Sequence, residues 1–346
     1  MRKELLVFAA ALALAACAPK EAHLPRAAAD GINTAAFDQI FYDDNLVGST
    51  NEVHGVVVLK DGAVIYEKYD EAHSADMKHA LWSGSKTFTA TAIGIAADEG
   101  LLSVDDPVTK FFDSSELPAN PSDSLKAMTV WNLLTMTSGF KDDKLGETEA
   151  LALKDPTRFM LHDTFSFYPG EKFVYNSMNT YLLSVIVTKV TGKKLVDYLE
   201  EKLFKPMGIS DFYWSESAEG YNMGGWGLFL RTEDLAKMGQ LFLDKGKWNG
   251  KQLVSEKWIA DAMSVQVMPT LGQAPQRPGW PVQEDWVAGY GYQMWKCDNG
   301  TFRIDGAWGQ WAVIAPDKNV VIAVNSLCGN AQGVLRYVMK DIYDKI

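Results

Sequence analysis

The chain has 346 residues, of which 47% are hydrophobic and 22% are charged, and its formal net charge at pH 7 is −11. This composition excludes a disordered chain, and the length allows one large domain or two lobes. The negative charge, with no cluster of basic residues, excludes a typical nucleic-acid-binding protein.

The first 17 residues have the pattern of a secretory signal. Arg2 and Lys3 precede an apolar stretch from Leu5 to Ala16, and these are the charged and apolar parts of such a signal. The segment before and including Cys17 resembles the lipobox of bacterial lipoproteins, so we expect Cys17 to become the lipidated first residue. The alternative is an ordinary signal peptide with an incidental cysteine.

Lipidation at Cys17 predicts a periplasmic protein anchored to a membrane. Ala18 follows it instead of the Asp associated with inner-membrane retention, so we expect the outer membrane of a Gram-negative bacterium. Each buried CH₂ of the acyl chains contributes roughly 0.8 kcal/mol to anchoring. Residues 18–33 are Ala-rich and polar and are predicted to be a tether, and the folded domain is predicted to span 34–346.

The first elements of this domain are predicted to be a helix and a hairpin. Residues 34–46 have the pattern of a short amphipathic helix. Two β-branched runs, 53–59 and 64–69, are separated by a segment that contains Asp61-Gly62, and Asp-Gly is a strong hairpin-turn signal.

A serine and a lysine one helical turn apart open the next helix. Ser83 and Lys86 begin an Ala-rich apolar run that stops at Gly100. Both side chains should lie on one face, beside the positive end of the helix, which suits a serine nucleophile with a lysine base. The same spacing recurs at Ser138 and Lys141, but there it follows a helix, so the context favours Ser83.

The rest of the chain is predicted to be helical first and then to form strands. Residues 101 to about 220 have helical periodicity with many breaks, and a long loop without periodicity spans 268–288. Further elements are predicted as helices at 233–244, 255–263 and 331–346 and as strands at 289–297, 302–304, 310–315 and 320–327. Strands at both chain ends predict an α/β (α+β) fold: one sheet flanked by helices, with an inserted all-helical lobe at roughly 101–220.

Two cysteines remain beyond the signal. Cys297 and Cys328 each end a predicted strand. In an oxidising compartment they form either a disulfide or two buried thiols, and the sequence leaves both open.

Other chemistries have weak support. The chain contains no His-Glu-x-x-His, no Gly-x-Ser-x-Gly, no phosphate loop and no dinucleotide fingerprint. Its five histidines are interpreted as surface or core residues, at positions 23, 54, 73, 79 and 162. We therefore predict neither a metal site nor a cofactor.

The order of these pieces resembles the serine hydrolases of the class C β-lactamase and penicillin-binding family, nearest to their esterase and nylon-oligomer (6-aminohexanoate-dimer) hydrolase branch. Four blocks carry the resemblance in sequence order: residues 82–89, 128–139, 168–175, and 190–192 with 206–208. The resemblance implies a β-lactamase-like fold and a small-molecule substrate. It also makes the segment that holds Ser138 structural.

The family's second motif, Tyr-x-Asn, is altered in this chain. Tyr175 occupies its first place, but Ser177 stands where the Asn is expected, and Ser177-Met178-Asn179 offers a rival Ser-x-Asn register. The distance from Tyr175 to Leu182-Leu183 fits the esterase and nylon-hydrolase branch, so we assign Tyr175 to the catalytic group and Ser177 to substrate binding.

The family's third motif, a Lys or His followed by Thr or Ser and Gly, is absent. Its register falls on Ile304-Asp305-Gly306, ahead of Trp308. Because a β-lactam carries a carboxylate, an Asp in place of the cation should disfavour it. We predict that Asp305, Gly306 and Trp308 contact substrate, together with Asn222 by resemblance to the nylon-hydrolase branch.

The resemblance implies an acyl-enzyme mechanism. Ser83 would attack the carbonyl, and Lys86 and Tyr175 would relay its proton. Free Lys and Tyr have pKa values near 10, so a deprotonated one at pH 7 costs roughly 4 kcal/mol unless the site shifts it, and which of the two is the base stays open. The backbone N–H groups of Ser83 and Ala307 would hold the oxyanion.

A further set of aromatic residues either lines an acyl pocket or belongs to the core: Trp226, Trp286 and Trp308.

These inferences predict a lipid-anchored periplasmic serine hydrolase that cleaves a carboxylic ester or amide. The enzyme alternative is a β-lactamase or D-Ala-D-Ala carboxypeptidase. The alternative from another class is an inactive lipoprotein that binds cell-wall peptide, which would not need Ser83, Lys86 and Tyr175 together. The sequence does not determine the oligomeric state.

Overall fold

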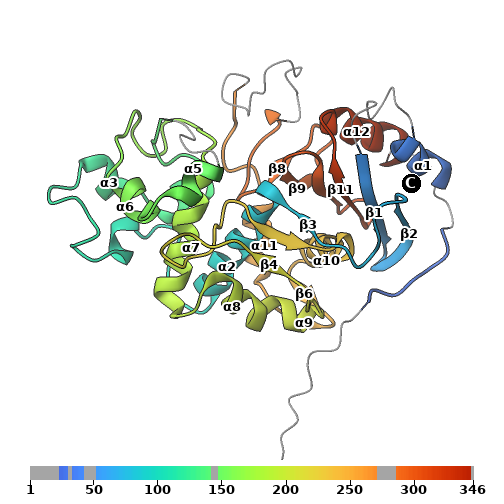
Figure 1. Cartoon of the computed structure of the whole chain (residues 1–346), viewed down its shortest axis with the longest axis horizontal. Coiled ribbons are helices and arrows are strands. Elements are labelled where there is room, and N and C mark those ends of the chain that lie inside the picture. The colour runs from blue at the N-terminus through green and yellow to red at the C-terminus, as the bar shows by residue number, and fades with distance from the viewer. Residues whose placement is uncertain (1–22, 30–32, 43–51, 142–146, 271–285, 344–346) are drawn as a thin grey trace, which may run out of the picture.

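The structure is a computed structural model, and it describes residues 23–29, 33–42, 52–141, 147–270 and 286–343. A sheet built from both ends of the chain lies at one end of the molecule, and helices fill the other (Figure 1). The prediction of an antiparallel sheet with an inserted helical lobe is confirmed.

The main sheet has six strands in the order β2-β1-β11-β10-β9-β8, and every neighbouring pair is antiparallel. Its strands are β1 (Glu52–Lys60), β2 (Ala63–Tyr69), β8 (Trp295–Lys296), β9 (Phe302–Gly306), β10 (Gln310–Ala315) and β11 (Val320–Leu327). The β1–β2 turn has φ of 52° at Asp61 and 77° at Gly62, the backbone of a two-residue hairpin turn, so the Asp-Gly signal predicted the correct position.

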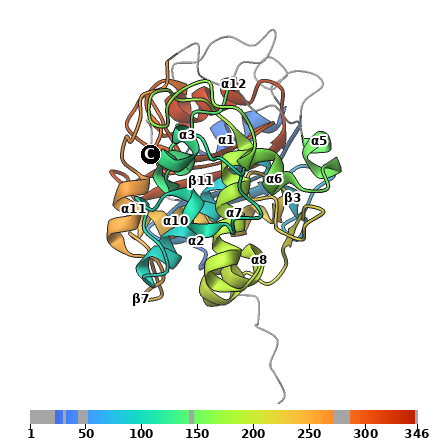
Figure 2. The same cartoon turned by 90° about the vertical axis from the view of Figure 1, so that its left-hand side faces the viewer.

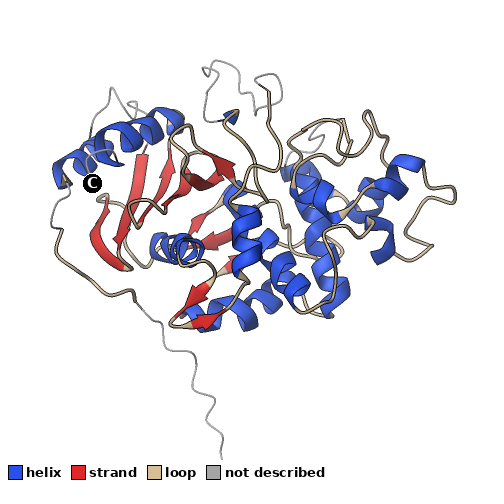
Figure 3. Ribbon diagram, turned by 180° about the vertical axis from the view of Figure 1, so that it is seen from behind, coloured by secondary structure: helices blue, strands red, loops and turns tan. Residues whose placement is uncertain are grey.

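Helices cover both faces of this sheet. Along β1, Val56 and Val58 pack in the core under the outer helices, whereas Val57 and Leu59 face the main core. The outer layer consists of α1 (Thr34–Tyr42), α12 (Ala331–Tyr337) and the π-helix η5 (Val338–Ile342), and the inner face carries α10 (Thr232–Leu243), as Figure 3 shows from behind. Because both faces are covered, β1 and β11 are almost continuously apolar instead of alternating.

The helical lobe surrounds two long helices, α2 (Ser85–Asp98) and α7 (Ser177–Thr191), which pack on each other (Figure 2). The Asn176 side chain caps α7 by accepting from the Met178 N–H at 2.9 Å, and Gly192 ends the helix with φ of 69°. The other elements are η1 (Trp82–Gly84), η2 (Val108–Phe111), α3 (Asp123–Ala127), α4 (Val130–Leu134), α5 (Glu147–Ala152), α6 (Pro156–Leu161), α8 (Leu195–Leu199), η3 (Glu200–Phe204) and α9 (Lys205–Met207).

Two small sheets were not predicted. One has the order β3-β5-β4, and the other is the hairpin β6–β7, which precedes α11 (Glu256–Ala262). Their strands are β3 (His79–Ala80), β4 (Tyr213–Trp214), β5 (Leu228–Leu230), β6 (Lys247–Trp248) and β7 (Lys251–Gln252). Strands of two or three residues are too short to show a period of two, so a search for alternation does not find them.

The predicted strand at 289–297 is mostly an irregular segment that ends in β8, and Gln293 explains why. Gln293 has a left-handed φ of 58°, which interrupts a strand. Its buried amide donates to the Leu134 carbonyl at 2.7 Å and accepts from the Thr180 hydroxyl at 2.6 Å, while its own carbonyl accepts from the Thr87 hydroxyl at 2.9 Å. This residue therefore ties α2, α4 and α7 together at the end of the sheet.

The part of the predicted tether that the structure describes, residues 23–29, lies along the domain and is not an independent linker. The Ala27 N–H donates to the Val64 carbonyl at 2.9 Å, and the Val64 N–H donates to the Pro25 carbonyl at 2.8 Å. The buried Glu233 carboxylate accepts from the Leu24 N–H at 2.6 Å. The tether prediction is therefore wrong for this segment. Within the described ranges, no helix has the length and hydropathy needed to cross a membrane.

The two cysteines are both buried, and the structure holds them as thiols. The Cys297 sulfur accepts from an Arg303 nitrogen at 3.4 Å. Burial raises the pKa of the Cys328 thiol to about 11. Both lie in the core under the outer helices.

Candidate active site

Ser83 lies in a tight turn between the small sheet and α2. Strand β3 ends at Ala80, η1 spans Trp82–Gly84, and α2 begins at Ser85. Trp82 has φ of 48°, a left-handed backbone that is costly for a bulky residue and that clusters at functional sites. Lys86 follows in the first turn of α2 with 1% of its surface exposed.

The amine of Lys86 joins three segments of the chain. Its Nζ lies 2.9 Å from the Ser83 Oγ, 3.1 Å from the Ser177 Oγ and 2.7 Å from the Gly225 carbonyl oxygen. It also lies 4.9 Å from the centre of the Tyr175 ring. The structure thus brings together Ser83, Lys86, Tyr175 and Ser177, although up to 94 positions separate them in sequence.

These contacts suit both protonation states of the amine. An ammonium can donate to all three oxygens. A neutral amine can donate to the Gly225 carbonyl and the Ser177 hydroxyl and can accept from the Ser83 hydroxyl through its lone pair. A proton can therefore pass between Ser83 and Lys86 without leaving either group unpartnered.

Both candidates of the altered second motif lie at this site. Ser177 is the first residue of α7 and reaches Lys86 with its hydroxyl, while the Tyr175 ring lies beside the amine. The two are therefore partners in one arrangement instead of rival registers.

An aromatic cluster adjoins Tyr175. The Tyr175 ring stacks on the Trp295 ring, with their centroids 5.8 Å apart. It lies edge-on to the Tyr290 ring, with their centroids 6.4 Å apart. Complete burial, with the nearby charges of Tyr175 and Asp305, raises the pKa of Tyr290 well above its usual value. Trp286 packs edge-on against Trp295 at 4.5 Å, whereas Trp226 belongs to the main core.

The segment 222–225 reaches the site through its backbone. A Cβ on Gly225 would lie 2.4 Å from the Ser177 carbonyl oxygen, so only glycine allows this approach. The side chain of Asn222 points elsewhere: it is fully buried, accepts from the Val196 N–H at 3.0 Å and donates to the Trp214 carbonyl at 3.4 Å. We therefore correct the expectation that Asn222 binds substrate, since its amide is used to hold this loop.

The end of β9 lies against the Ser83 turn. A Cβ on Gly306 would come within 2.1 Å of the Leu81 carbonyl oxygen and 3.1 Å of the Gly84 nitrogen. Ala307 and Trp308 follow in the turn to β10, where Trp308 has φ of 66° and its carbonyl accepts from the Cys328 N–H at 2.9 Å. The backbone predicted to hold an oxyanion is thus next to η1.

Asp305 is paired with an arginine that the sequence argument did not consider. The Arg303 Nε donates to its carboxylate at 2.7 Å, and the Arg303 side chain is fully buried. Ile304, the first residue of the register that corresponds to the family's third motif, is fully buried in the main core. The site therefore has no cation at that register, and the negative charge of Asp305 is compensated.

The second Ser-x-x-Lys spacing is structural. Ser138 is 2% exposed and follows α4, whereas Lys141 is exposed. Gly139 has φ of 92°, and a Cβ there would lie 2.5 Å from the Phe167 carbonyl oxygen. This tight turn fits the expectation that Ser83, not Ser138, belongs to the site.

Comparisons with known proteins found a related hydrolase and solved structures of the same fold. The chain is 26% identical over 224 residues to the 6-aminohexanoate-dimer hydrolase of Paenarthrobacter ureafaciens, covering 60% of this chain but only 56% of that enzyme. Among solved structures, a putative 6-aminohexanoate-dimer hydrolase from Bacillus anthracis matches with a TM-score of 0.72, at 22% identity, over 94% of this chain and 88% of that one. EstCE1, a hydrolase with promiscuous acyltransferase activity, matches with a TM-score of 0.69, at 15% identity, over 88% and 97%.

The two structural matches are below 25% identity and therefore show a common fold. A family model extends the likeness across the whole site, because it matches residues 44–331, from the segment before β1 to the start of α12. On that match, the chain belongs to the Beta-lactamase family, a family of hydrolases.

Proposed function

We propose that the protein is a serine hydrolase that cleaves a carboxylic ester or amide through an acyl-enzyme on Ser83. The observation that carries this proposal is the 2.9 Å contact between the Ser83 hydroxyl and the buried Lys86 amine. A nucleophile within hydrogen-bonding reach of a base that is itself held by further groups is the usual arrangement of covalent catalysis. The relatedness to an amide hydrolase and the fold shared with an acyl-transferring hydrolase support it.

In the proposed reaction the Ser83 Oγ attacks the carbonyl carbon, and its proton passes to the Lys86–Tyr175 pair. The carbonyl oxygen becomes an oxyanion held by the N–H groups of Ser83 and Ala307, each typically worth roughly 3 kcal/mol of the barrier. The proton then goes to the leaving alcohol or amine as the carbonyl–leaving-group bond breaks. Water attacks the acyl-enzyme by the reverse path, which releases the acid and restores Ser83.

A β-lactam is a poorer candidate for the substrate. Ile304 offers no cation for a β-lactam carboxylate. Arg303 neutralises Asp305, but the pair presents no positive charge to a substrate. Both features favour an uncharged acyl group beside the aromatic cluster of Tyr175, Tyr290 and Trp295.

A fluorophosphonate probe tests the nucleophile. The wild-type chain should be labelled, and Ser83→Ala should show no label because the attacking oxygen is gone. Ser138→Ala, which removes the other serine of a Ser-x-x-Lys, should be labelled like the wild type. Labelling that survives in Ser83→Ala would remove Ser83 from the mechanism.

We also propose that the chain is a lipoprotein anchored through Cys17 in the outer membrane. The support is the lipobox-like sequence alone, since residues 1–22 lie outside the part of the chain that the structure describes. Cells fed a clickable palmitate analogue should label the wild type and fractionate it with membranes. The Cys17→Ser protein should lose both the palmitate label and its fractionation with membranes. A Cys17→Ser protein that keeps the label would refute the anchor.

A further inference from the structure

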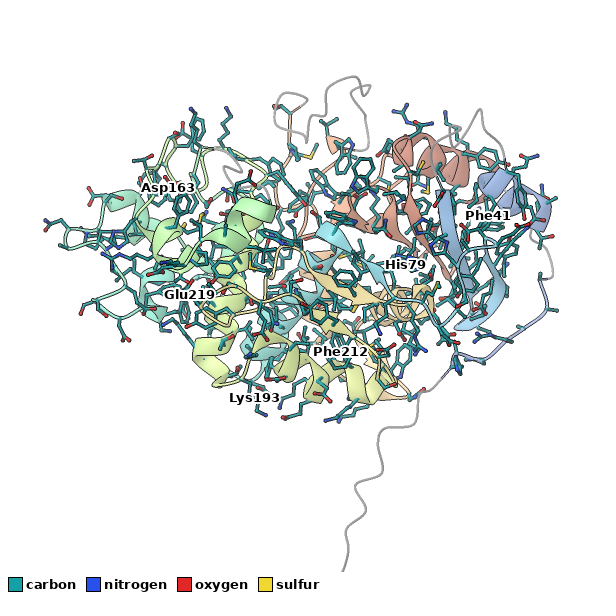
Figure 4. All side chains as sticks on the ribbon, in the orientation of Figure 1. Phe41, His79, Asp163, Lys193, Phe212 and Glu219 are labelled. Carbon is teal, nitrogen blue, oxygen red and sulfur yellow. The ribbon has the colours of Figure 1, made fainter. Side chains whose placement is uncertain are left out.

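We propose that His54, His73 and His79 form a binding site for one zinc ion, separate from the Ser83 site. One ring nitrogen from each of the three lies within 4.8 Å of the others. They come from β1, from the loop after β2 and from β3, so only the fold brings them together. Figure 4 labels His79 on the side of β3 that faces the six-stranded sheet.

The distances suit a tetrahedral ion. The Nδ1 atoms of His54 and His79 lie 3.3 Å apart. Two imidazole nitrogens that each bind zinc at about 2.0–2.1 Å with tetrahedral angles are about 3.3 Å from one another. The third nitrogen, on His73, needs to move inward by at most about 1.5 Å. His73 lies on a loop and is partly exposed, so its ring can turn away from its stacking contact with His54.

Two carboxylates lie outside the rings. The Asp70 carboxylate lies within hydrogen-bonding distance of the Nδ1 of His73, at 2.7 Å, whereas the Glu52 carboxylate lies 3.5 Å from the Nε2 of His54 without a hydrogen bond to it. The Asp70 contact favours the tautomer of His73 with its proton on Nδ1, which leaves the lone pair on Nε2 for a metal. Carboxylates in this position are the usual partners of zinc-binding histidines, and they add negative charge next to the ion.

His79 supplies the second argument. It is 8% exposed, so its ring is largely removed from water, and its Nδ1 faces the Nδ1 of His54 at 3.3 Å. A bound ion gives this buried polar ring a use that the rest of the fold does not provide.

The backbone also directs these side chains. The pairing of β1 with β11 shifts register between Val53 and Gly55, which makes His54 the extra residue of a bulge. Bulges re-aim side chains and are often kept for that purpose. The Asp70 N–H donates to the His54 carbonyl at 3.2 Å, which holds the loop of His73 beside this bulge.

Solvent reaches the cluster through a surface hollow of about 520 Å³. The hollow is lined by His73, Met77, Lys78, His79, Tyr213 and Phe229. The one cation in this lining, Lys78, is paired with Asp211. A water in the hollow can take the fourth position on the ion, as in zinc sites with three histidine ligands.

Titration calorimetry with zinc chloride on the full chain, without a histidine tag and stripped with EDTA, tests the proposal. The wild type should bind one zinc per chain, and zinc should raise its melting temperature. His73→Ala should lose this binding, and Asp70→Asn, which keeps the three rings, should weaken it 10–100-fold. His162→Ala, a change of an exposed histidine in the helical lobe, should bind like the wild type.

Circular dichroism of each stripped variant separates loss of the site from loss of the fold. Folded His73→Ala and Asp70→Asn proteins that bind zinc as tightly as the wild type would overturn the proposal, as would a wild type that binds none. Because the assay measures binding and not hydrolysis, its result does not depend on the function proposed for Ser83.

Discussion

Lys86→Met should lower kcat/KM for an activated ester such as p-nitrophenyl butyrate by roughly 10³–10⁴-fold, because it removes one member of the pair that we propose takes the Ser83 proton. Methionine approximates the length of the lysine stem in a site that is 1% exposed, so the packing is largely kept. The loss should appear in kcat more than in KM, since Lys86 acts in the transition state. Initial rates over a range of ester concentrations measure both.

A double variant sharpens this prediction. If Ser83 and Lys86 act as one unit, Ser83→Ala with Lys86→Met should be no slower than Ser83→Ala alone. The control is Lys141→Met, which changes the lysine of the structural Ser-x-x-Lys and should leave the rate unchanged. A folded Lys86→Met that keeps more than a tenth of the wild-type kcat would contradict the assignment of Lys86 to proton transfer.

The sequence predicts the main sheet well because its signals are strong and local. Asp61-Gly62 marks the first hairpin, and the apolar runs of β10 and β11 have the bounds that were predicted for them. The prediction at 289–297 is wrong because Gln293 takes a left-handed backbone to reach three helices with its amide. No local signal announces such a residue, since tertiary hydrogen bonds decide its conformation.

For the site, the sequence could identify side chains that belong to motifs but not groups that act through the backbone. Ser83, Lys86 and Tyr175 were predicted as a group, and the structure brings them together. The Gly225 carbonyl was missed, and Asn222 was chosen in its place, because a pattern of residue types does not tell whether a loop presents its side chain or its main chain. The Gly224-Gly225 pair was the available signal, since adjacent glycines often mark a close backbone approach.

The histidine cluster shows the limit of motif reading more clearly. A metal site was excluded because no short spacing such as His-Glu-x-x-His occurs, but the three rings come from separate elements. Side chains contributed by two sheets and a loop have no fixed spacing, so no motif could have predicted the site proposed for them. The sequence did not predict β3, and only the fold places its His79 3.3 Å from His54 of β1.

Gly225→Ala should lower the free energy of unfolding by about 3 kcal/mol and reduce kcat/KM by at least about 100-fold. A Cβ at this position would lie 2.4 Å from the Ser177 carbonyl oxygen, which is backbone in the first turn of α7 and cannot rotate away. The loop must therefore retreat, and the Gly225 carbonyl would lose its 2.7 Å contact with the Lys86 amine. Chemical denaturation gives the change in stability, and ester hydrolysis gives the rate.

Gly220→Ala in the same loop is the matched control. Nothing lies within 4 Å of a Cβ there, although its φ of 82° makes alanine strained by about 1 kcal/mol. It should therefore lose some stability but keep its activity, whereas Gly225→Ala should lose both. Equal losses of stability in the two variants, with full activity in Gly225→Ala, would mean that Lys86 does not need this carbonyl. Its orientation would then have to come from Ser83 and Ser177, and the close approach of the loop would serve packing only.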